Sequence, residues 1–182
     1  MTEVHTLPGR WESATEIVRR FKAKEQSAVE VVTDAFKRID QLNTRYGAVT
    51  FADREGVLES ARGLDRKLAT DQKLGPLAGI PTLMKDLYGF RPGWPTTLGG
   101  FPAARHDIAP ADLWSRYPLQ VTRNDGLLLG QTNSSTFGFC GATDNAIFGP
   151  SRNPFNPSRN SGGSSGGSAV AVTADLADHR AA

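Results

Sequence analysis

Two segments of this chain contain residues suited to hydrolytic chemistry: a serine in a glycine-rich loop and a lysine after an apolar run. The loop lies at residues 160–172 and reads Asn-Ser-Gly-Gly-Ser-Ser-Gly-Gly-Ser-Ala-Val-Ala-Val, with Ser164 at its centre. Glycine and serine alone are also typical of a solvated linker. This loop, however, runs directly into small and β-branched apolar residues, and its glycines allow the backbone to approach a bound group closely. We therefore interpret it as part of a site.

Lys85 ends the second segment and follows residues 80–84, which read Ile-Pro-Thr-Leu-Met. A serine hydroxyl becomes a strong nucleophile only when an adjacent base takes its proton. A lysine amine can be that base only when it is neutral, and burial in apolar surroundings lowers its pKa towards neutrality. An isolated lysine is more often solvated or ion-paired, because lysines are almost never fully buried. The role of Lys85 therefore depends on the motifs around it.

These segments resemble the motifs of the amidase signature family, which hydrolyses carbon–nitrogen bonds with a Ser–cis-Ser–Lys triad. Residues 162–169 match its defining Gly-Gly-Ser-Ser-Gly-Gly-Ser-Ala run. Residues 75–86, which read Gly-Pro-Leu-Ala-Gly-Ile-Pro-Thr-Leu-Met-Lys-Asp, match the strand that carries its lysine. Lesser matching blocks follow in the family's order at 96–99, 128–133, 144–149 and 153–156.

The resemblance implies that Lys85 is the catalytic lysine and that Ser164 is the bridging serine, which follows a cis peptide bond and relays a proton. Contacts to substrate are not assigned by it; the other residues of the motif loop are Gly162, Gly163, Ser165, Gly166 and Gly167. In the family, the attacking serine and the oxyanion hole lie in a later stretch, beyond position 182. We therefore expect this chain alone not to be a competent amidase.

Three functional interpretations follow. The chain is part of a hydrolase of small carboxamides, a non-catalytic remnant or binding module that keeps part of the amide pocket, or one component of a split or oligomeric assembly. The third class includes the relative that transfers ammonia onto charged transfer RNA. Residues 91–100 look more like the general amidases, so we rank that variant lower.

Several local signals predict the elements that hold these residues. Ser13 and Ser27 each precede a glutamate by three residues, which is the capping box that opens helices. We also predict a strand at 46–51, a helix at 53–69 and strands ending at Lys85 and spanning 127–130. An apolar stripe at helical spacing follows the second capping box, namely Val29, Val32, Phe36 and Ile39.

Helices that alternate with apolar strands indicate an α/β layered architecture. The resemblance implies an α/β/α sandwich with a mixed central sheet, truncated here, with residues 1–182 as the N-terminal portion of a single amidase-like domain. Strands that lack their neighbours would present open edges, at which another chain could associate. We therefore expect possible association through open sheet edges and poor solubility of the chain alone.

Two stretches depart from the expected pattern. A helix is expected at residues 115–125, yet Pro118 lies within it, and proline inside a helix costs about 3 kcal/mol. Thr122 in the same stretch stands where an apolar residue would pack better. The tail at 175–182 replaces a Gly-Leu-x-Pro segment followed by an apolar strand in the family.

Composition excludes several classes of function. The chain has 182 residues, 38% of them hydrophobic, which is enough for a real core. A net charge of +2 without a basic cluster gives no indication of nucleic-acid binding. No apolar run is long enough for a membrane span, and a single cysteine, Cys140, fits a reducing, cytoplasmic location. Three scattered histidines, His5, His106 and His179, give little support for a metal site, and we expect no cofactor.

Overall fold

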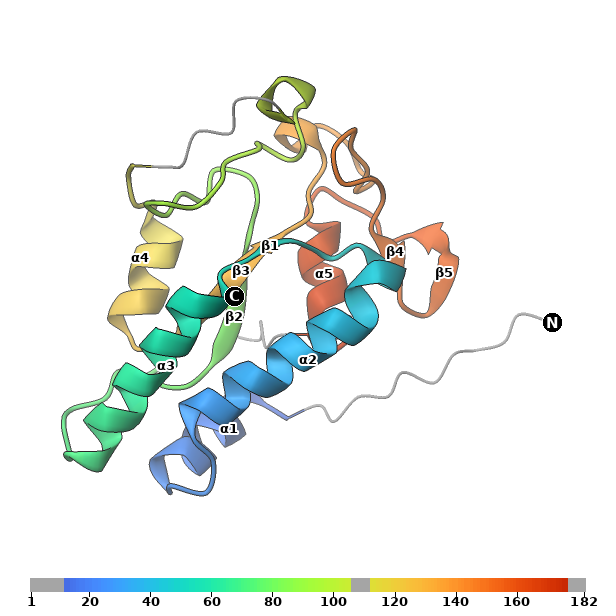
Figure 1. Ribbon diagram of the computed structural model, residues 1–182. Coiled ribbons are helices and arrows are strands. Elements are labelled where there is room, and N and C mark those ends of the chain that lie inside the picture. Colours follow the sequence, from blue (N-terminus) through green and yellow to red (C-terminus); the bar gives the residue numbers. More distant parts are fainter. Residues whose placement is uncertain (1–11, 106–111, 177–182) are drawn as a thin grey trace.

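A three-stranded mixed sheet forms the centre of the protein, in the order β1–β3–β2 (Figure 1). The computed structural model describes residues 12–105 and 112–176. β3 (Leu127–Thr132) is the middle strand and runs parallel to β2 (Pro81–Lys85) and antiparallel to β1 (Val49–Ala52). Every residue of β3 is buried, as expected for a central strand covered on both faces. The predicted mixed central sheet is therefore confirmed.

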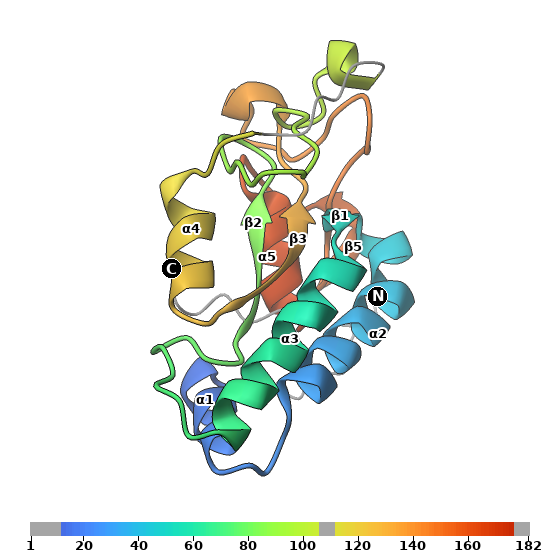
Figure 2. The same cartoon turned by 60° about the vertical axis from the view of Figure 1, so that its left-hand side comes forward.

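Helices cover both faces of this sheet. α4 (Arg116–Arg123) and α5 (Gly166–Thr173) lie on opposite sides of it (Figure 1). α2 (Ala28–Tyr46) and α3 (Arg54–Ala69) run side by side and pack on each other (Figure 2). The arrangement is the layered α/β fold that the alternation of helices and strands predicted.

Alternate residues of the strands point into two hydrophobic cores, because successive side chains of a strand face opposite sides. Leu127 and Leu129 join the larger core, which includes residues of α2, α3 and α5. Leu128 joins a smaller core with Met84 of β2 and Val121 of α4. The sheet thus carries a packed layer on each face.

The helix starts follow the predicted capping signals. Ser13 precedes α1 (Ala14–Lys22), and its hydroxyl accepts the N–H of Glu16 at 3.2 Å. Ser27 and Glu30 form a complete capping box at the start of α2. The apolar stripe of that helix faces the core, although Val29 is only partly buried.

The strand predicted at 46–51 begins too early. Tyr46 is instead the last residue of α2, where its side chain is buried in the larger core. Gly47 ends the helix in a left-handed conformation, with φ of 61°. The Asn43 side chain then accepts the N–H groups of Ala48 and Val49, so the chain turns before β1 begins. The predicted helix at 53–69 is confirmed as α3, with Asp53 as its N-cap.

The proline penalty expected in the stretch 115–125 does not arise. α4 forms there, and Ser115 is its N-cap, so Pro118 lies in the first turn. Backbone N–H groups of a first turn have no partner within the helix, so proline removes no hydrogen bond at that position. Thr122 is on the exposed face and donates its hydroxyl to the carbonyl of Pro118 at 2.9 Å.

Apart from α4 and β3, the described part of the chain between β2 and α5 consists mainly of loops with short elements. These are two 3-10 turns at Pro102–Arg105 and Thr136–Gly138 and a hairpin formed by β4 (Arg152–Asn153) and β5 (Asn156–Asn160). Of the divergent tail, residues 177–182 lie outside the described residues, whereas Leu176 is fully buried. Among the described residues, no helix has the length and apolar character needed to cross a membrane.

β2 is one of the two outer strands of the described sheet. A side chain bonds to part of its outer backbone edge. Residues 81–84 are buried, and the carbonyl of Leu83 accepts the hydroxyl of Tyr117 at 3.4 Å. Pro81 has no N–H to offer to another strand. Association through the sheet edges stays a prediction.

Candidate active site

The candidate site lies where β2 and β3 end. Lys85 is the last residue of β2 and pairs in register with Thr132, the last residue of β3. Because the two strands are parallel, the segments that follow them leave the sheet at the same edge, which is the usual place for sites in α/β folds. Asp86 and residues 133–135 continue from the strands and are buried although they are polar.

Lys85 and Ser164 meet at this edge. The Nζ atom of Lys85 donates to the Oγ atom of Ser164 at 2.7 Å, although the two residues are 79 positions apart. The peptide bond between Gly163 and Ser164 is cis. Burial lowers the pKa of Lys85, because an ammonium ion loses hydration there. The pair predicted from the sequence is therefore in direct contact, with its amine shifted towards the neutral form.

Glycines in the motif loop allow its backbone to pack against neighbouring backbone. A Cβ atom on Gly163 would lie 2.9 Å from the carbonyl oxygen of Cys140. On Gly167 it would lie 2.4 Å from the backbone nitrogen of Asn133. The N–H of Gly167 donates to the carbonyl of Asn133 at 3.1 Å, so this close approach fixes α5 to the end of β3.

The remaining residues of the motif loop have separate positions. Gly162 has a left-handed φ of 85°. Ser165 is exposed and is the N-cap of α5, without a side-chain capping hydrogen bond. Gly166 is buried, and its N–H donates to the hydroxyl of Thr143 at 2.8 Å. Within the described residues, the loop thus presents Ser164 to Lys85 and Ser165 to the surface.

An aspartate and a threonine that the sequence did not single out are buried beside this pair. The carboxylate of Asp86 accepts the N–H of Thr97 at 3.2 Å and also the Thr97 hydroxyl. Burial raises the pKa of Asp86 to about 6, and the hydrogen bonds from Thr97 oppose that rise. Both residues belong to matched motif blocks, so the blocks indicated their positions but not their contact.

An asparagine pair forms a second network that the sequence did not predict. The Asn145 amide donates to the side-chain oxygen of Asn133 at 2.6 Å and to the carbonyl of Ser134 at 2.9 Å. The side-chain oxygen of Asn145 accepts the N–H of Phe148 at 2.8 Å. Asn133 also donates to the carbonyl of Gly149 at 3.0 Å. These bonds hold the segment after β3 against the loop at 144–149.

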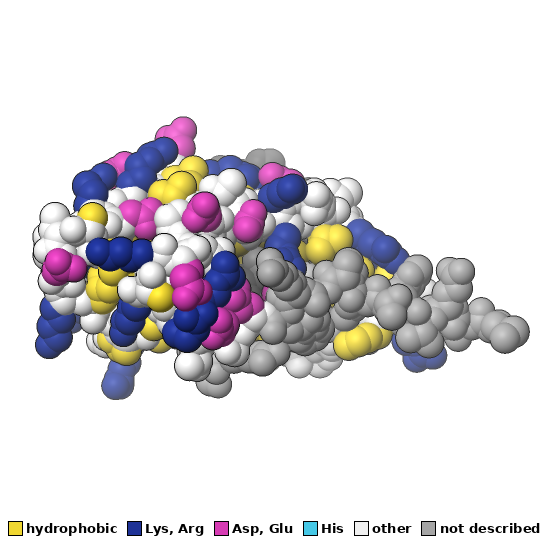
Figure 3. All heavy atoms as spheres, turned by 90° about the horizontal axis from the view of Figure 1, so that it is seen from below, with side chains coloured by type: hydrophobic (Ala, Val, Ile, Leu, Met, Phe, Trp, Pro, Cys, Tyr) yellow, Lys and Arg dark blue, Asp and Glu magenta, His cyan; other side chains and the backbone are white. Residues whose placement is uncertain are grey.

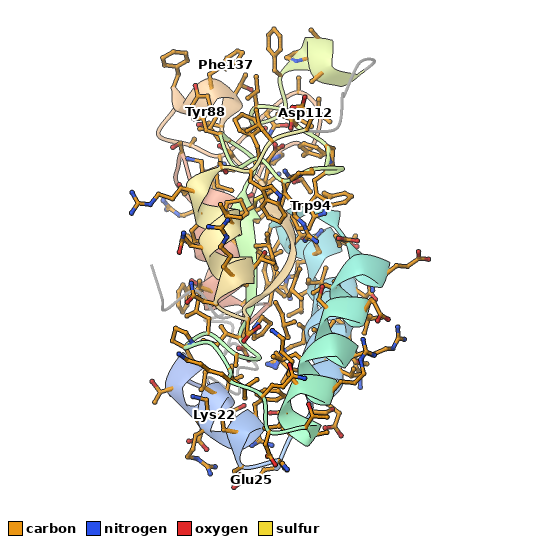
Figure 4. All side chains as sticks on the ribbon, turned by 90° about the vertical axis from the view of Figure 1, so that its left-hand side faces the viewer. Lys22, Glu25, Tyr88, Trp94, Asp112 and Phe137 are labelled. Carbon is orange, nitrogen blue, oxygen red and sulfur yellow. The ribbon has the colours of Figure 1, made fainter. Side chains whose placement is uncertain are left out.

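A segment with two aromatic residues, Phe137 and Phe139, passes beside Ser164. A Cβ atom on Gly138 would lie 3.8 Å from the Oγ atom of Ser164, which places the segment 137–139 beside the hydroxyl. The ring of Phe137 lies 4.9 Å from that of Phe101 and 6.4 Å from that of Phe139. Phe139 is 91% exposed. Figure 4 shows Phe137 and Tyr88 together at this end of the molecule.

This arrangement can transfer protons between a hydroxyl and an amine. A neutral lysine within hydrogen-bond distance of a serine can take its proton and later return it. The described residues contain no group of three or more His, Cys, Asp or Glu placed to hold a metal ion. The histidines at 5, 106 and 179 lie outside that part of the chain.

Known proteins resemble this chain in sequence and in fold. A family model described as Amidase matches residues 30–179. The chain is 40% identical over 163 residues to a glutamyl-tRNA(Gln) amidotransferase subunit of Acidothermus cellulolyticus, covering 89% of this chain and 31% of that relative. It is 38% identical over 166 residues to an acylamidase of Rhodococcus erythropolis, covering 91% of this chain and 34% of that relative.

A solved structure agrees with these sequence matches. The crystal structure of a bacterial aryl acylamidase of the amidase signature family matches this fold with a TM-score of 0.88 and 45% identity. The match covers 97% of this chain and 35% of that chain. The chain therefore spans about a third of the length of these relatives.

Proposed function

This chain belongs to the amidase signature family, and from that premise we propose that Lys85 and Ser164 are the base and the proton relay of a hydrolase of small carboxamides. The observation that carries the proposal is the 2.7 Å contact between Lys85 Nζ and Ser164 Oγ. The lowered pKa of Lys85 supports it, because only the neutral amine can accept a proton.

In the proposed first step, Ser164 takes the hydroxyl proton of an attacking serine and passes its own proton to the Lys85 amine. The attacking oxygen bonds to the carbonyl carbon of the amide, and an electron pair moves onto the carbonyl oxygen. When that pair returns, the carbon–nitrogen bond breaks, and the leaving nitrogen takes the proton from Lys85 through Ser164. Water then cleaves the resulting ester by the same relay. The proposal takes the attacking serine and the oxyanion donors from outside residues 12–176.

A second function has support from the relatives. The curated relative at 40% identity is named as a subunit of an amidotransferase, which favours a component of a larger assembly that transfers ammonia. The aryl acylamidase structure at 45% identity favours hydrolysis of an amide. Lys85 and Ser164 would have the same proton-transfer role in both. A cytoplasmic location stays a prediction.

Activity of the reconstituted hydrolase tests the proposal. The full chain would be mixed with the separately expressed later two-thirds of an aryl acylamidase relative, and release of aniline from an anilide would be followed. We expect Lys85→Met or Ser164→Ala to reduce turnover by about 10⁴-fold or more, as removal of a triad member does in other hydrolases. Lys22→Met, which changes a lysine at the opposite end of the molecule, is the matched control and should retain full turnover (Figure 4).

Retained turnover in Lys85→Met would reject the proposed base. If no mixture hydrolyses an anilide while an unreactive amide analogue still binds, the binding-module interpretation replaces the hydrolase. Glutamine-dependent ammonia release only in the presence of amidotransferase partner proteins would instead establish the second function.

A further inference from the structure

The residue after Lys85 anchors a tight turn. Asp86 is only 2% exposed, and both of its carboxylate oxygens accept hydrogen bonds from Thr97. The Thr97 hydroxyl in turn accepts the N–H of Gly100 at 2.9 Å. Asp86 therefore fixes the start of the turn at 97–100, and Thr97 closes it.

This turn packs by its backbone beneath the segment 135–138. Its last three residues are left-handed, with φ of 53° at Leu98, 75° at Gly99 and 70° at Gly100. A Cβ atom on Gly99 would lie 2.3 Å from the carbonyl oxygen of Ser135, so only glycine fits there. The carbonyl of Leu98 accepts the N–H of Phe137 at 3.0 Å. The carbonyl of Gly99 accepts the hydroxyl of Thr136 at 2.9 Å.

The segment 135–138 is also in contact with Ser164. The N–H of Ser135 donates to the carbonyl of Ser164 at 3.3 Å, and Gly138 lies beside the Ser164 hydroxyl. A continuous series of contacts therefore runs from Asp86 through Thr97 and the turn to Ser164. Lys85, the neighbour of Asp86, contacts the same hydroxyl directly.

We propose that Asp86 is a positioning residue, which acts through Thr97 and the turn at 97–100 to hold the Ser164 hydroxyl at hydrogen-bond distance from Lys85. The inference rests on the proposed function, because the distance between Ser164 and Lys85 affects activity only if a proton passes between them. A displacement of about 1 Å can reduce the rate of an enzyme roughly 10²-fold. Two neighbouring residues at the end of one strand would thus fix the same serine from two sides.

The energetics of Asp86 support a positioning role. Burial raises the pKa of this carboxyl, which means that the ionised form is less stable in the folded chain than in water. Fold stability alone would favour an apolar residue at such a buried position. The hydrogen bonds to Thr97 are therefore the contribution of Asp86 that an apolar side chain could not replace.

Matched variants of the full chain test this inference. Thr97→Val keeps the shape of the side chain and removes the hydroxyl, whereas Thr97→Ser keeps the hydroxyl. Asp86→Ala removes both acceptor oxygens. Asp86→Asn keeps one acceptor for the Thr97 N–H and offers an N–H donor to the Thr97 hydroxyl. If Asp86→Ala fails to fold, Thr97→Val still carries the test, because it leaves the carboxyl in place.

Two measurements report the position of Ser164 without requiring turnover. In Thr97→Val, amide hydrogen exchange at residues 135–138 and 162–165 should be faster by about tenfold or more, the equivalent of losing a hydrogen bond to a charged group. Exchange in α2 should not change. The NMR titration of Lys85, assigned by its loss in Lys85→Met, should move towards the ordinary lysine pKa as water enters. Thr97→Ser and Asp86→Asn should stay near the wild type in both measurements.

Uniformly faster exchange in α2 and in the loop would show that Thr97 only stabilises the fold, and unchanged exchange at 162–165 would remove the coupling. Either result overturns the inference. Because neither measurement needs hydrolysis, the result stands whatever the anilide assay gives. Loss of turnover in Lys85→Met together with wild-type exchange in Thr97→Val would keep the proposed function and reject Asp86 as a positioning residue.

Discussion

The two ends of the molecule differ in the polar contacts that stabilise each of them. At the site end, which comprises residues 85–86, 97–100, 132–145 and 160–168, buried groups bond to partners far away in the sequence. The Thr132 hydroxyl, for example, lies 2.7 Å from that of Ser168. At the helical end, which comprises α1, α3 and the start of α2, many partners are neighbours on exposed helix surfaces. Exceptions are Asp65 of α3, which accepts the N–H groups of Ala28 and Val29, and the pair Lys67–Asp125. Figure 4 places Lys22 and Glu25 at this end and Tyr88 and Phe137 at the other.

Ion pairs at the helical end illustrate the contrast. Arg19 bonds Glu16 and Glu25 at 2.7 and 2.9 Å, and each of these side chains is more than two-fifths exposed. Arg66 and Glu59 are more exposed still. Figure 3 shows basic and acidic side chains interspersed over the face seen from below. Such pairs contribute little to stability, because water and salt compete for the same groups.

The difference concerns what replaces a lost contact. Water takes the place of a missing partner on the exposed surfaces of the helical end, whereas at the site end the remaining group stays buried without a hydrogen bond. Identical substitutions should therefore have unequal effects at the two ends. The site end also places Lys85 and Ser164, so damage there affects the fold and the proposed chemistry together.

Replacing a helical glycine by alanine should change stability in opposite directions at the two ends. Gly167→Ala puts a methyl group 2.4 Å from the backbone of Asn133, and overpacking of this kind costs about 3 kcal/mol. Gly63→Ala in α3 meets nothing closer than 3.7 Å and should stabilise by roughly 0.5–1 kcal/mol, since alanine favours a helix. Urea unfolding of the two variants measures both values. A gain in stability for Gly167→Ala would show that the close approach at α5 is not constrained.

Acidification should also act in opposite directions at the two ends. Hydrogen bonds from Arg19 lower the pKa of Glu16 and Glu25, so their contribution is present at neutral pH and is lost as the pH falls through the lowered values. Burial raises the pKa of Asp86 to about 6. Between its ordinary value and 6 the folded chain binds more protons than the unfolded chain, so the contribution of Asp86 to stability falls as the pH rises.

Comparison with Asp86→Asn isolates this second effect, because the variant has no carboxyl to titrate at that position. The unfolding free energy of the wild type relative to Asp86→Asn should rise by about 2 kcal/mol between pH 7 and pH 4.5. Urea unfolding at several pH values measures it, and Glu59→Gln is a control at the helical end. Parallel stability curves for the wild type and Asp86→Asn would mean that the Asp86 pKa is not raised.

The same contrast explains how much of the fold could be predicted from the sequence. Ser13 and Ser27 identified two helix starts, because a capping residue and the groups that it bonds lie within one turn. The strand start was misplaced at Tyr46, because packing of its ring against the core keeps this residue in α2. Pro118 was misjudged because a proline penalty depends on its distance from the start of the helix.

For the site, the sequence identified residue types but not all of their contacts. Lys85 and Ser164 were identified through motifs, since no local pattern connects residues so far apart. The Asp86–Thr97 and Asn133–Asn145 contacts went unpredicted although all four residues lie within matched blocks. Which polar group meets which depends on how the loops cross at the ends of β2 and β3, and a single sequence does not contain that information.

The two helix caps give the last and smallest test. The Ser27 hydroxyl accepts the N–H of Glu30 at 3.1 Å, three residues away on an exposed surface. The hydroxyl of fully buried Thr143 accepts the N–H of Gly166 at the start of α5, across 23 positions. Ser27→Ala should cost about 1 kcal/mol, the usual value for a lost cap. Thr143→Val should cost about 2 kcal/mol, because it leaves a buried N–H without a partner.

Urea unfolding measures both costs, and hydrogen exchange separates their locations. Thr143→Val should accelerate exchange at Gly166 and in the loop around Ser164, since the Thr143 hydroxyl also lies 3.4 Å from the Ser164 carbonyl. Ser27→Ala should accelerate exchange only at the start of α2, because its partners are all within that turn. A larger loss of stability in Ser27→Ala than in Thr143→Val would contradict this comparison. Burial would then not explain which contacts are costly to lose.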